Sequence, residues 1–372
     1  MKKISLLLIL VLLVGCNGVN KTNDDYDLAI LNNSGTSSQI DFIKGDKIES
    51  SKRMPQVTYP YSESTLMTYN KKHNKIFSIA ESPTHHTYMT QTDIKTKESK
   101  RIKVQSQRQD RYVSDIISQD DYVYILIQGD DDNILQNYDR RIFFIKYNIE
   151  TNKKEEVILS DYADSRMSLI GDKIYFVDNG DNNTLIELDP KTMKAKEYGG
   201  LKSDVYFETI ENDNNGNIYL GGSDLASGEE DKIDYIYQYN LKTQRSKKIE
   251  IGTPYITDIK YKDNKLYLTH NDFSYEKQFT KLSVYNLKDN TKKTIDLDGV
   301  PSNLSIGNDK VYLYLRKFVA LEDSGDAQSP GGCGDGKIST YQINNKNNDL
   351  KLIEDKKEIN NKMCFGSLEA LK

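Results

Sequence analysis

The chain has 372 residues, with 51 Lys and Arg against 56 Asp and Glu and a formal net charge of −5 at pH 7. This acidic balance argues against a nucleic-acid partner, because nucleic-acid-binding surfaces carry clustered positive charge. The chain has only four His, which argues against a His-rich metal centre. No apolar run after residue 15 reaches the length of a membrane span.

The first fifteen residues have the organisation of a secretory signal peptide. Lys2 and Lys3 precede an apolar run at 4–14, which is too short to cross a bilayer but has the length of a signal-peptide core. Residues 13–16, Leu-Val-Gly-Cys, resemble the bacterial lipobox. The resemblance implies cleavage before Cys16, acylation of Cys16 with a fatty acid such as palmitate, and anchoring by lipid on the extracytoplasmic face of the cell membrane. The alternative is a buried N-terminal helix with an incidental cysteine.

The segment that follows the signal peptide is polar. Residues 16–26 lack apolar periodicity, so we expect the lipidated cysteine to be followed by a flexible tether. The length of the remainder would allow two domains. We nevertheless expect 27–372 to form a single domain, because one repeat runs through all of it.

The repeat begins with a polar turn and continues as a short alternating strand whose third position is aromatic. The aromatic residues are Phe77, Tyr124, Tyr175, Tyr219, Tyr267 and Tyr312. Their spacing of 44 to 51 residues is the length of one four-stranded propeller blade. A second motif, such as Tyr-Asn-Ile-Glu-Thr-Asn at 147–152, follows each copy and fits a half-buried strand with a hairpin turn.

A seventh blade is predicted from the two ends of the domain. Residues 27–32, 38–44 and 47–52 align with the second, third and fourth strands of a blade, and 363–371 supply the first. Pairing the chain ends would remove the free sheet edges that invite aggregation. We therefore predict an all-β fold, a β-propeller of seven four-stranded blades; six or eight blades are the alternatives.

The segments Asn-Asn-Gly-Asn-Ile-Tyr-Leu at 214–220 and Tyr-Asn-Leu-Lys-Thr at 239–243 resemble a broad group of bacterial propellers. These are loosely grouped as lactonase-like, NHL-like or YVTN-like. The resemblance covers the whole exported domain and implies its fold, whereas activity has to be argued from a site.

Two cysteines remain besides Cys16. Cys333 lies in a Gly-rich segment, and Cys364 opens the predicted C-terminal strand. The split-blade arrangement places both on one face, and an extracytoplasmic location permits a disulfide. A disulfide between Cys333 and Cys364 would close a loop of about 30 residues and stabilise the fold by roughly 3–4 kcal/mol. The alternative is a redox-active or metal-binding thiol, although no Cys-x-x-Cys spacing is present.

The long connections at 128–141, 222–233 and 316–336 are acidic, while the turns near 242–248 and 288–293, on the opposite face, are basic. The acidic connections form either ordinary solvated surface or a binding surface for a cationic partner or Ca²⁺. His73 falls in a turn, where we expect it to be solvated. The candidate binding residues of the connections are Asp130, Asp131, Asp132, Asp224, Glu229, Glu230, Asp231, Glu322, Asp323 and Asp326.

Two functions compete on these observations. Nucleophile-elbow, P-loop, dinucleotide and HExxH motifs are absent, which favours a non-enzymatic binding or scaffold propeller without a cofactor, for a protein, peptide or envelope polymer. The alternative is a lactonase-like or lyase-like hydrolase with Ca²⁺ or another divalent metal in the central channel. Its metal ligands would be Glu208, Asp258 and Asn303, near the starts of innermost strands.

Overall fold

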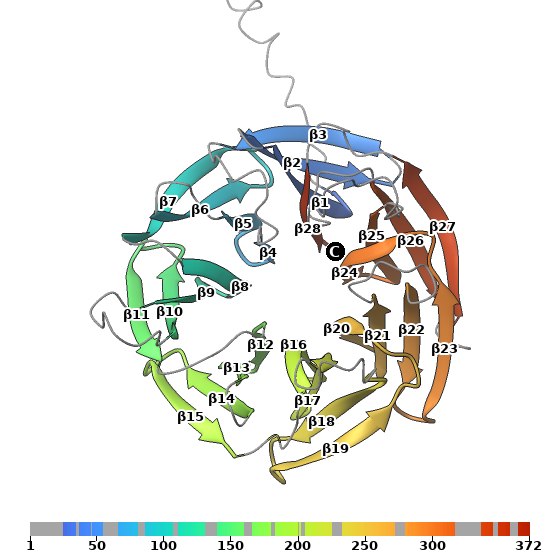
Figure 1. Cartoon of the computed structure of the whole chain (residues 1–372). Coiled ribbons are helices and arrows are strands. Elements are labelled where there is room, and N and C mark those ends of the chain that lie inside the picture. Colours follow the sequence, from blue (N-terminus) through green and yellow to red (C-terminus); the bar gives the residue numbers. More distant parts are fainter. Residues whose placement is uncertain are drawn as a thin grey trace, which may run out of the picture.

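The computed structural model is a ring of radial blades around a central axis, as Figure 1 shows. In the part of the chain described below, no helix is long and apolar enough to cross a membrane. The structure describes residues 25–372 except 35–36, 46, 55–65, 81–85, 107–110, 131–139, 160–165, 180–182, 200, 202–204, 225–232, 272–279, 317–335, 345–348 and 358–363.

Seven antiparallel sheets of four strands make up the ring, which confirms the predicted seven-bladed β-propeller. Within each sheet the strands run in order from the axis to the rim (Figure 1). Blades 1 to 3 contain β4 (Leu66–Asn70), β5 (Lys75–Ala80), β6 (His86–Asp93) and β7 (Ser99–Ser106); β8 (Arg111–Gln119), β9 (Tyr122–Asp130), β10 (Arg140–Asn148) and β11 (Lys154–Leu159); and β12 (Ser168–Ile170), β13 (Lys173–Asp178), β14 (Thr184–Asp189) and β15 (Lys194–Tyr198).

The remaining blades repeat this order, and blade 7 joins the two ends of the domain. Blades 4 to 6 contain β16 (Val205–Asn212), β17 (Asn217–Asp224), β18 (Tyr235–Asn240) and β19 (Arg245–Glu250); β20 (Ile256–Lys262), β21 (Lys265–His270), β22 (Lys281–Asn286) and β23 (Thr291–Asp296); and β24 (Val300–Gly307), β25 (Lys310–Arg316), β26 (Gly336–Asn344) and β27 (Asp349–Lys357). Blade 7 contains β28 (Cys364–Ala370), β1 (Leu28–Ser34), β2 (Ser37–Lys44) and β3 (Lys47–Met54).

The ring closes through pairing of the chain ends, as predicted. β28 is the innermost strand of blade 7 and pairs with β1, with Leu368 opposite Ile30. The Leu371 backbone N–H donates to the Asp27 carbonyl at 3.0 Å, and the Lys372 ammonium donates to the Asp27 carboxylate at 2.8 Å. The last residues of the chain therefore hold its first described residues in the same sheet.

Apolar clusters between adjacent blades hold the ring together. In β9, Val123 and Ile125 pack towards blade 1, whereas Tyr124 and Leu126 pack towards blade 3. Successive side chains of a strand point to opposite faces, so a strand enclosed by two neighbouring blades has apolar residues on both of its faces. This enclosure explains why the second strand of each blade is the most apolar segment of its repeat.

The recurring aromatic residue has one structural role. It belongs to the cluster between its own blade and the next one along the chain, from Phe77 between blades 1 and 2 to Tyr312 between blades 6 and 7. In blade 7 the equivalent position is Ala29, in the cluster shared with blade 1. The seventh blade therefore lacks the aromatic residue by which the other six are found in the sequence.

Tight turns join the strands on one side of the ring. Asp263 and Asn264, between β20 and β21, both have positive φ, at 51° and 59°, which defines the two-residue hairpin turn favoured by strand twist. Asn152 and Asn290 take positive φ in the turns between third and fourth strands. Asn and Asp tolerate this conformation better than other side chains, although Lys97, Met193 and Gln244 adopt it in the corresponding turns of other blades.

Candidate functional site

The two ends of the propeller differ in construction. On one end, which we call the turn face, the turns between first and second strands contact one another from blade to blade. The Asn70 side-chain amide donates to the Asp120 carbonyl at 3.0 Å, Gln119 donates to the Gly171 carbonyl at 3.1 Å, and the Asn308 N–H donates to the Lys372 carbonyl at 3.1 Å. Because blade strands alternate in direction, the second strands end on the opposite side, which we call the loop face.

The described chain begins on the turn face. Asp25 and Asp27 both contact the Lys372 ammonium, each at 2.8 Å, and the Asp27 carboxylate accepts the Gly45 N–H in the β2–β3 turn at 2.7 Å. The first described residue therefore lies on the side opposite the loop face.

The candidate binding residues belong to the connections of the loop face. Asp130 and Asp224 are the last residues of β9 and β17. The others lie outside the described residues: Asp131, Asp132, Glu229, Glu230, Asp231, Glu322, Asp323 and Asp326.

The three cysteine positions are not tested by the structure. Cys16 and Cys333 lie outside the described residues, while Cys364 begins β28 and pairs through its backbone with Asn33. The Cys333–Cys364 disulfide and the lipid on Cys16 stay predictions.

The innermost strands carry a repeated irregularity where they approach the channel. Register shifts interrupt the pairing of β8, β16, β20 and β24 with their second strands. A bulge of this kind bends a strand and re-aims its side chains, and bulges are enriched beside functional sites. The residues directly after the shifts are Asp115, Thr209, Asp258 and Asn303.

Asp258 is the centre of an ion network that joins blades 3 and 5. Its side chain is only 6% exposed, and Arg166 Nη1 lies 3.1 Å from one carboxylate oxygen. The Lys260 ammonium lies 3.8 Å from the other oxygen, which also accepts the Ile259 N–H at 2.9 Å. The charge of Asp258 raises the pKa of both Arg166 and Lys260, so both side chains remain cationic.

Asp115 occupies the equivalent position in blade 2 and links it to blade 3. Its carboxylate accepts the backbone N–H of Ile116 at 2.8 Å and that of Met167 at 2.6 Å. Burial raises the pKa of Asp115, while those hydrogen bonds and the nearby Arg166 charge oppose the rise.

Further carboxylates extend the network around the axis. The Ser223 hydroxyl donates to Glu208 at 2.7 Å. Burial raises the pKa of Glu211, and it raises the pKa of Glu369 to about 7, although the Lys260 charge opposes both shifts. Innermost strands of four blades thus contribute one acid-rich network, with Arg166 and Lys260 as its cations.

The predicted metal ligands occupy neighbouring innermost strands: Glu208 on β16, Asp258 on β20 and Asn303 on β24. Asp258 already contacts two cations and Glu208 accepts a hydrogen bond. A metal ion would have to displace Arg166 and Lys260 to use the Asp258 carboxylate. The proposal of these three as metal ligands stays untested, and the network favours a structural role for Asp258.

The sequence analysis did not identify Asp115, Arg166, Glu211, Lys260 or Glu369. A signal for them does exist in the repeat. Glu211, Lys260 and Glu369 pair with Tyr219, Tyr267 and Ala29. These last three residues occupy the position of the recurring aromatic residue in the second strand. An alignment of the first strands by the residue that faces this aromatic position would have identified the charged residues of the innermost strands.

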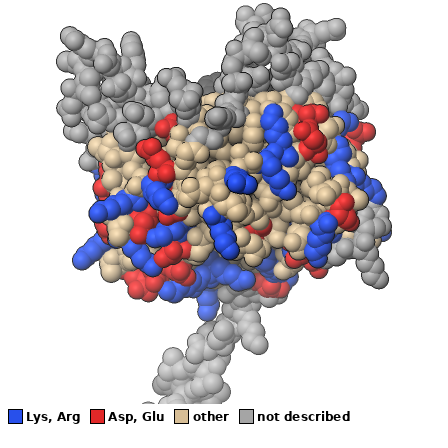
Figure 2. Space-filling view, turned by 90° about the horizontal axis from the view of Figure 1, so that it is seen from below, with Lys and Arg blue, Asp and Glu red and all other residues tan. Residues whose placement is uncertain are grey.

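The basic character expected of the turns belongs instead to the rim. The seven outermost strands together contain 17 Lys and Arg against 9 Asp and Glu, in a chain whose acids outnumber its bases. Figure 2 shows Lys and Arg interspersed with Asp and Glu over the presented side of the ring. Outermost strands are sheet edges, and lysine on an edge hinders pairing with another chain, which gives these residues a structural reason.

A groove of about 430 Å³ lies between blades 4 and 5 near the turn face, with Asn217, Asn290 and Tyr285 in its wall. These polar groups bond to one another or to neighbours: Asn240 donates to Asn217 at 2.8 Å, and the Tyr285 hydroxyl donates to Asn290 at 3.1 Å. The groove therefore offers fewer free polar groups than its composition indicates.

Solved structures share this architecture. A Lactobacillus plantarum protein is 9% identical with a TM-score of 0.62, over 93% of this chain and all of that chain. A putative 6-phosphogluconolactonase from Bacteroides uniformis is 10% identical with a TM-score of 0.57, over 94% of this chain and 99% of that chain. The propeller domain of the Trilobed protease from Pyrococcus furiosus is 15% identical with a TM-score of 0.53, over 89% and 100%.

These likenesses define the class of protein as a β-propeller, and at such identities they show the fold alone. The Pyrococcus furiosus propeller is described as having an open velcro topology, whereas β28 and β1 pair here. No protein-family model matches this sequence, and no curated protein has a matching sequence.

Proposed function

We propose that this chain is a non-enzymatic binding propeller, anchored by lipid on Cys16 to the extracytoplasmic face of the cell membrane. Its loop face binds a protein, a peptide or an envelope polymer. The observation that carries this proposal is the position of Asp25 on the turn face, tied to Lys372. A lipid at Cys16 would turn that face towards the membrane and the loop face away from it.

The length of the tether supports this orientation. Eight residues lie between Cys16 and Asp25, which allows a reach of roughly 30 Å when the segment is extended. Such a tether keeps the domain close to the lipid surface. Loops on a rigid scaffold commonly carry binding function, and here they would be the part of the molecule most distant from the membrane.

The ion network favours binding over metal-dependent hydrolysis. Asp258 is compensated by Arg166 and Lys260 at 3.1 and 3.8 Å. A carboxylate already neutralised by two protein cations has less attraction for a divalent ion. In the hydrolase alternative, Glu208, Asp258 and Asn303 would bind a metal ion, and the cations beside Asp258 disfavour a metal ion at that carboxylate.

A crosslinking pull-down from intact cells tests the proposal. The full lipidated chain is compared with a variant whose loops at 222–233 and 316–336 are shortened, and with a rim control, Lys247→Gln with Lys248→Gln. We expect a partner to be captured by the intact chain and the rim control but not by the loop variant. Equal capture by all three would contradict binding at the loop face.

The anchor is tested separately with Cys16→Ser. We expect the wild-type chain in the membrane fraction with incorporated fatty acid, and the variant without either. A variant that still carries fatty acid would contradict lipidation at Cys16.

A further inference from the structure

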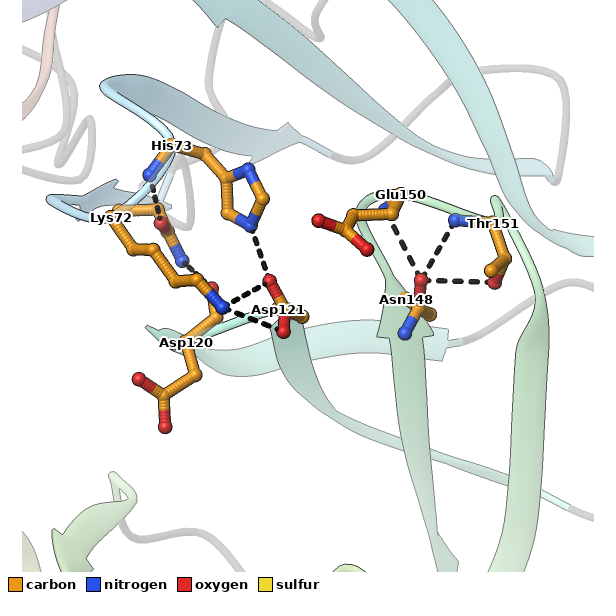
Figure 3. A network of polar contacts seen from close by, with 8 residues as sticks. Lys72, His73, Asp120, Asp121, Asn148, Glu150 and Thr151 are labelled. Carbon is orange, nitrogen blue, oxygen red and sulfur yellow. Dashed lines mark hydrogen bonds and ion pairs between the residues drawn. The ribbon is translucent and has the colours of Figure 1, made fainter.

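Three potential metal ligands from two blades meet on the turn face, apart from the channel network. They are His73 in the β4–β5 turn, Asp121 in the β8–β9 turn and Glu150 in the β10–β11 turn. One ligand atom from each lies within 4.8 Å of the other two. Figure 3 shows the Glu150 carboxylate pointing towards the His73 ring.

Local hydrogen bonds fix the turns that carry these side chains. The Asn70 side-chain oxygen accepts the His73 N–H at 2.9 Å, and its amide donates to the Asp120 carbonyl at 3.0 Å, which couples the turns of blades 1 and 2. Asn148 accepts the Glu150 N–H at 3.1 Å. The backbone positions of all three ligands are thus set before any ion binds, which lowers the ordering cost of binding.

Among the three ligands, His73 and Asp121 contact each other, while the Glu150 carboxylate faces solvent. His73 Nε2 lies 2.7 Å from Asp121 Oδ1, and the His73 side chain is only 16% exposed, so this His is less solvated than its turn position predicts. The described residues provide no hydrogen bond or ion pair to the Glu150 carboxylate. Glu150 is exposed, so its carboxylate can turn from water to a cation held beside the His73–Asp121 pair.

The side chains around the three ligands carry a net negative charge, which favours binding of a cation. Asp120, Asp121 and Glu150 are acidic, and Lys72 is the one cationic side chain drawn with them in Figure 3. The Lys72 ammonium lies 2.7 Å from Asp121 and would be repelled by a metal ion on the same carboxylate. The Asp120 carboxylate points away from the group in Figure 3, so it adds charge without being a ligand.

We propose that His73, Asp121 and Glu150 bind a divalent transition-metal ion, and that the ion clips blade 1 to blade 2 on the turn face. One imidazole and two carboxylates suit Zn²⁺ and its neighbours, whereas Ca²⁺ requires six to eight oxygen ligands. Three protein ligands leave a fourth position for water. Binding displaces Lys72 from Asp121, so Lys72 competes with the metal.

The test measures Zn²⁺ affinity by calorimetry and Co²⁺ coordination by visible absorption on the full lipidated chain in detergent, without a polyhistidine tag. We expect His73→Ala and Glu150→Gln each to weaken Zn²⁺ binding by more than about tenfold, since loss of even an outer-shell partner costs about 10–100-fold. We expect Lys72→Gln to strengthen it, because the competing cation is gone. Zn²⁺ should raise the thermal midpoint of wild type but not of His73→Ala.

Two controls separate this site from adventitious binding. His85→Ala with His86→Ala removes the adjacent histidines, and Asp172→Asn removes an exposed acid of the next blade, whose carboxylate contacts Lys191. Both should bind Zn²⁺ as wild type does. Absence of Zn²⁺ binding to the wild type, affinity unchanged by His73→Ala and Glu150→Gln, or loss of binding in the His85/His86 variant would overturn the proposal. Circular dichroism of each variant establishes that it is folded.

Discussion

At the scale of single residues, the channel network is held by the charge of Asp258. Asp258→Asn would leave Arg166 and Lys260 facing each other without their shared carboxylate. Both cations are about one-third exposed, so water screens them. We expect a loss of about 2 kcal/mol in unfolding free energy by urea denaturation, below the 3–5 kcal/mol of a fully buried pair.

A second substitution distinguishes charge from packing at the same place. Replacing Arg166 by Met in the Asp258→Asn background removes the guanidinium that has lost its carboxylate partner. We expect this double variant to recover part of the lost stability. Losses that simply add would contradict a direct interaction between the two side chains.

Glu369 makes the stability of the propeller depend on pH. Burial is the main cause that raises its pKa from 4.5 to about 7. The negative charge of Asp115 adds to this rise, and the positive charge of Lys260 reduces it. A carboxyl with a raised pKa in the folded state takes up a proton on folding, so its contribution to stability declines as pH rises from about 4.5 to about 7.

Glu369→Gln, which imitates the neutral form, is therefore expected to exceed the wild type by about 3 kcal/mol in unfolding free energy at pH 8 and to come close to it at pH 4.5. Urea unfolding at both pH values measures this difference, with the exposed Glu197→Gln on β15 as the matched control. A gain of the same size at pH 4.5 and pH 8 would exclude protonation of Glu369 as the cause.

At the scale of elements, β28 determines whether the ring closes. Removing 364–372 would uncover the inner edge of β1, where Leu28 and Ile30 are buried, and unpaired apolar edges promote aggregation. We expect the shortened chain to elute as aggregate in size-exclusion chromatography.

The matched control for this deletion is Lys372→Ala, which removes the terminal ion pairs but retains β28. It is expected to elute as a folded monomer with a slightly lower unfolding midpoint, since ion pairs that remain in contact with solvent contribute little. A shortened chain that is monomeric and as stable as this control would show that closure by β28 is dispensable.

At the scale of the whole molecule, the fold follows from the sequence more completely than the sites do. Each recurring aromatic residue, such as Tyr267, packs against the next blade. The interface between blades is therefore visible in the sequence of blades 1 to 6. Blade 7 has Ala29 at that position, and it was predicted instead by aligning 27–32, 38–44 and 47–52 with the second, third and fourth strands of the other blades.

The charged groups are harder to predict because their partners lie in other blades. Arg166 and Asp258 are 92 residues apart in the chain and meet only in the assembled ring. In the sequence, each resembles an ordinary solvated residue, Asp258 on the strand β20 and Arg166 in the segment before β12. His73 and Asp121 are 48 residues apart, one blade length, so comparing equivalent turns of neighbouring blades would have paired them.

The central claim, that the loop face meets a partner while the turn face meets the membrane, is tested most directly by photo-crosslinking in intact cells. A photoreactive residue is placed at position 224, which ends β17 on the loop face, or at position 172, in the β12–β13 turn. The account predicts protein or polymer adducts at 224 and lipid adducts at 172. Lipid adducts at 224 with protein adducts at 172 would contradict it.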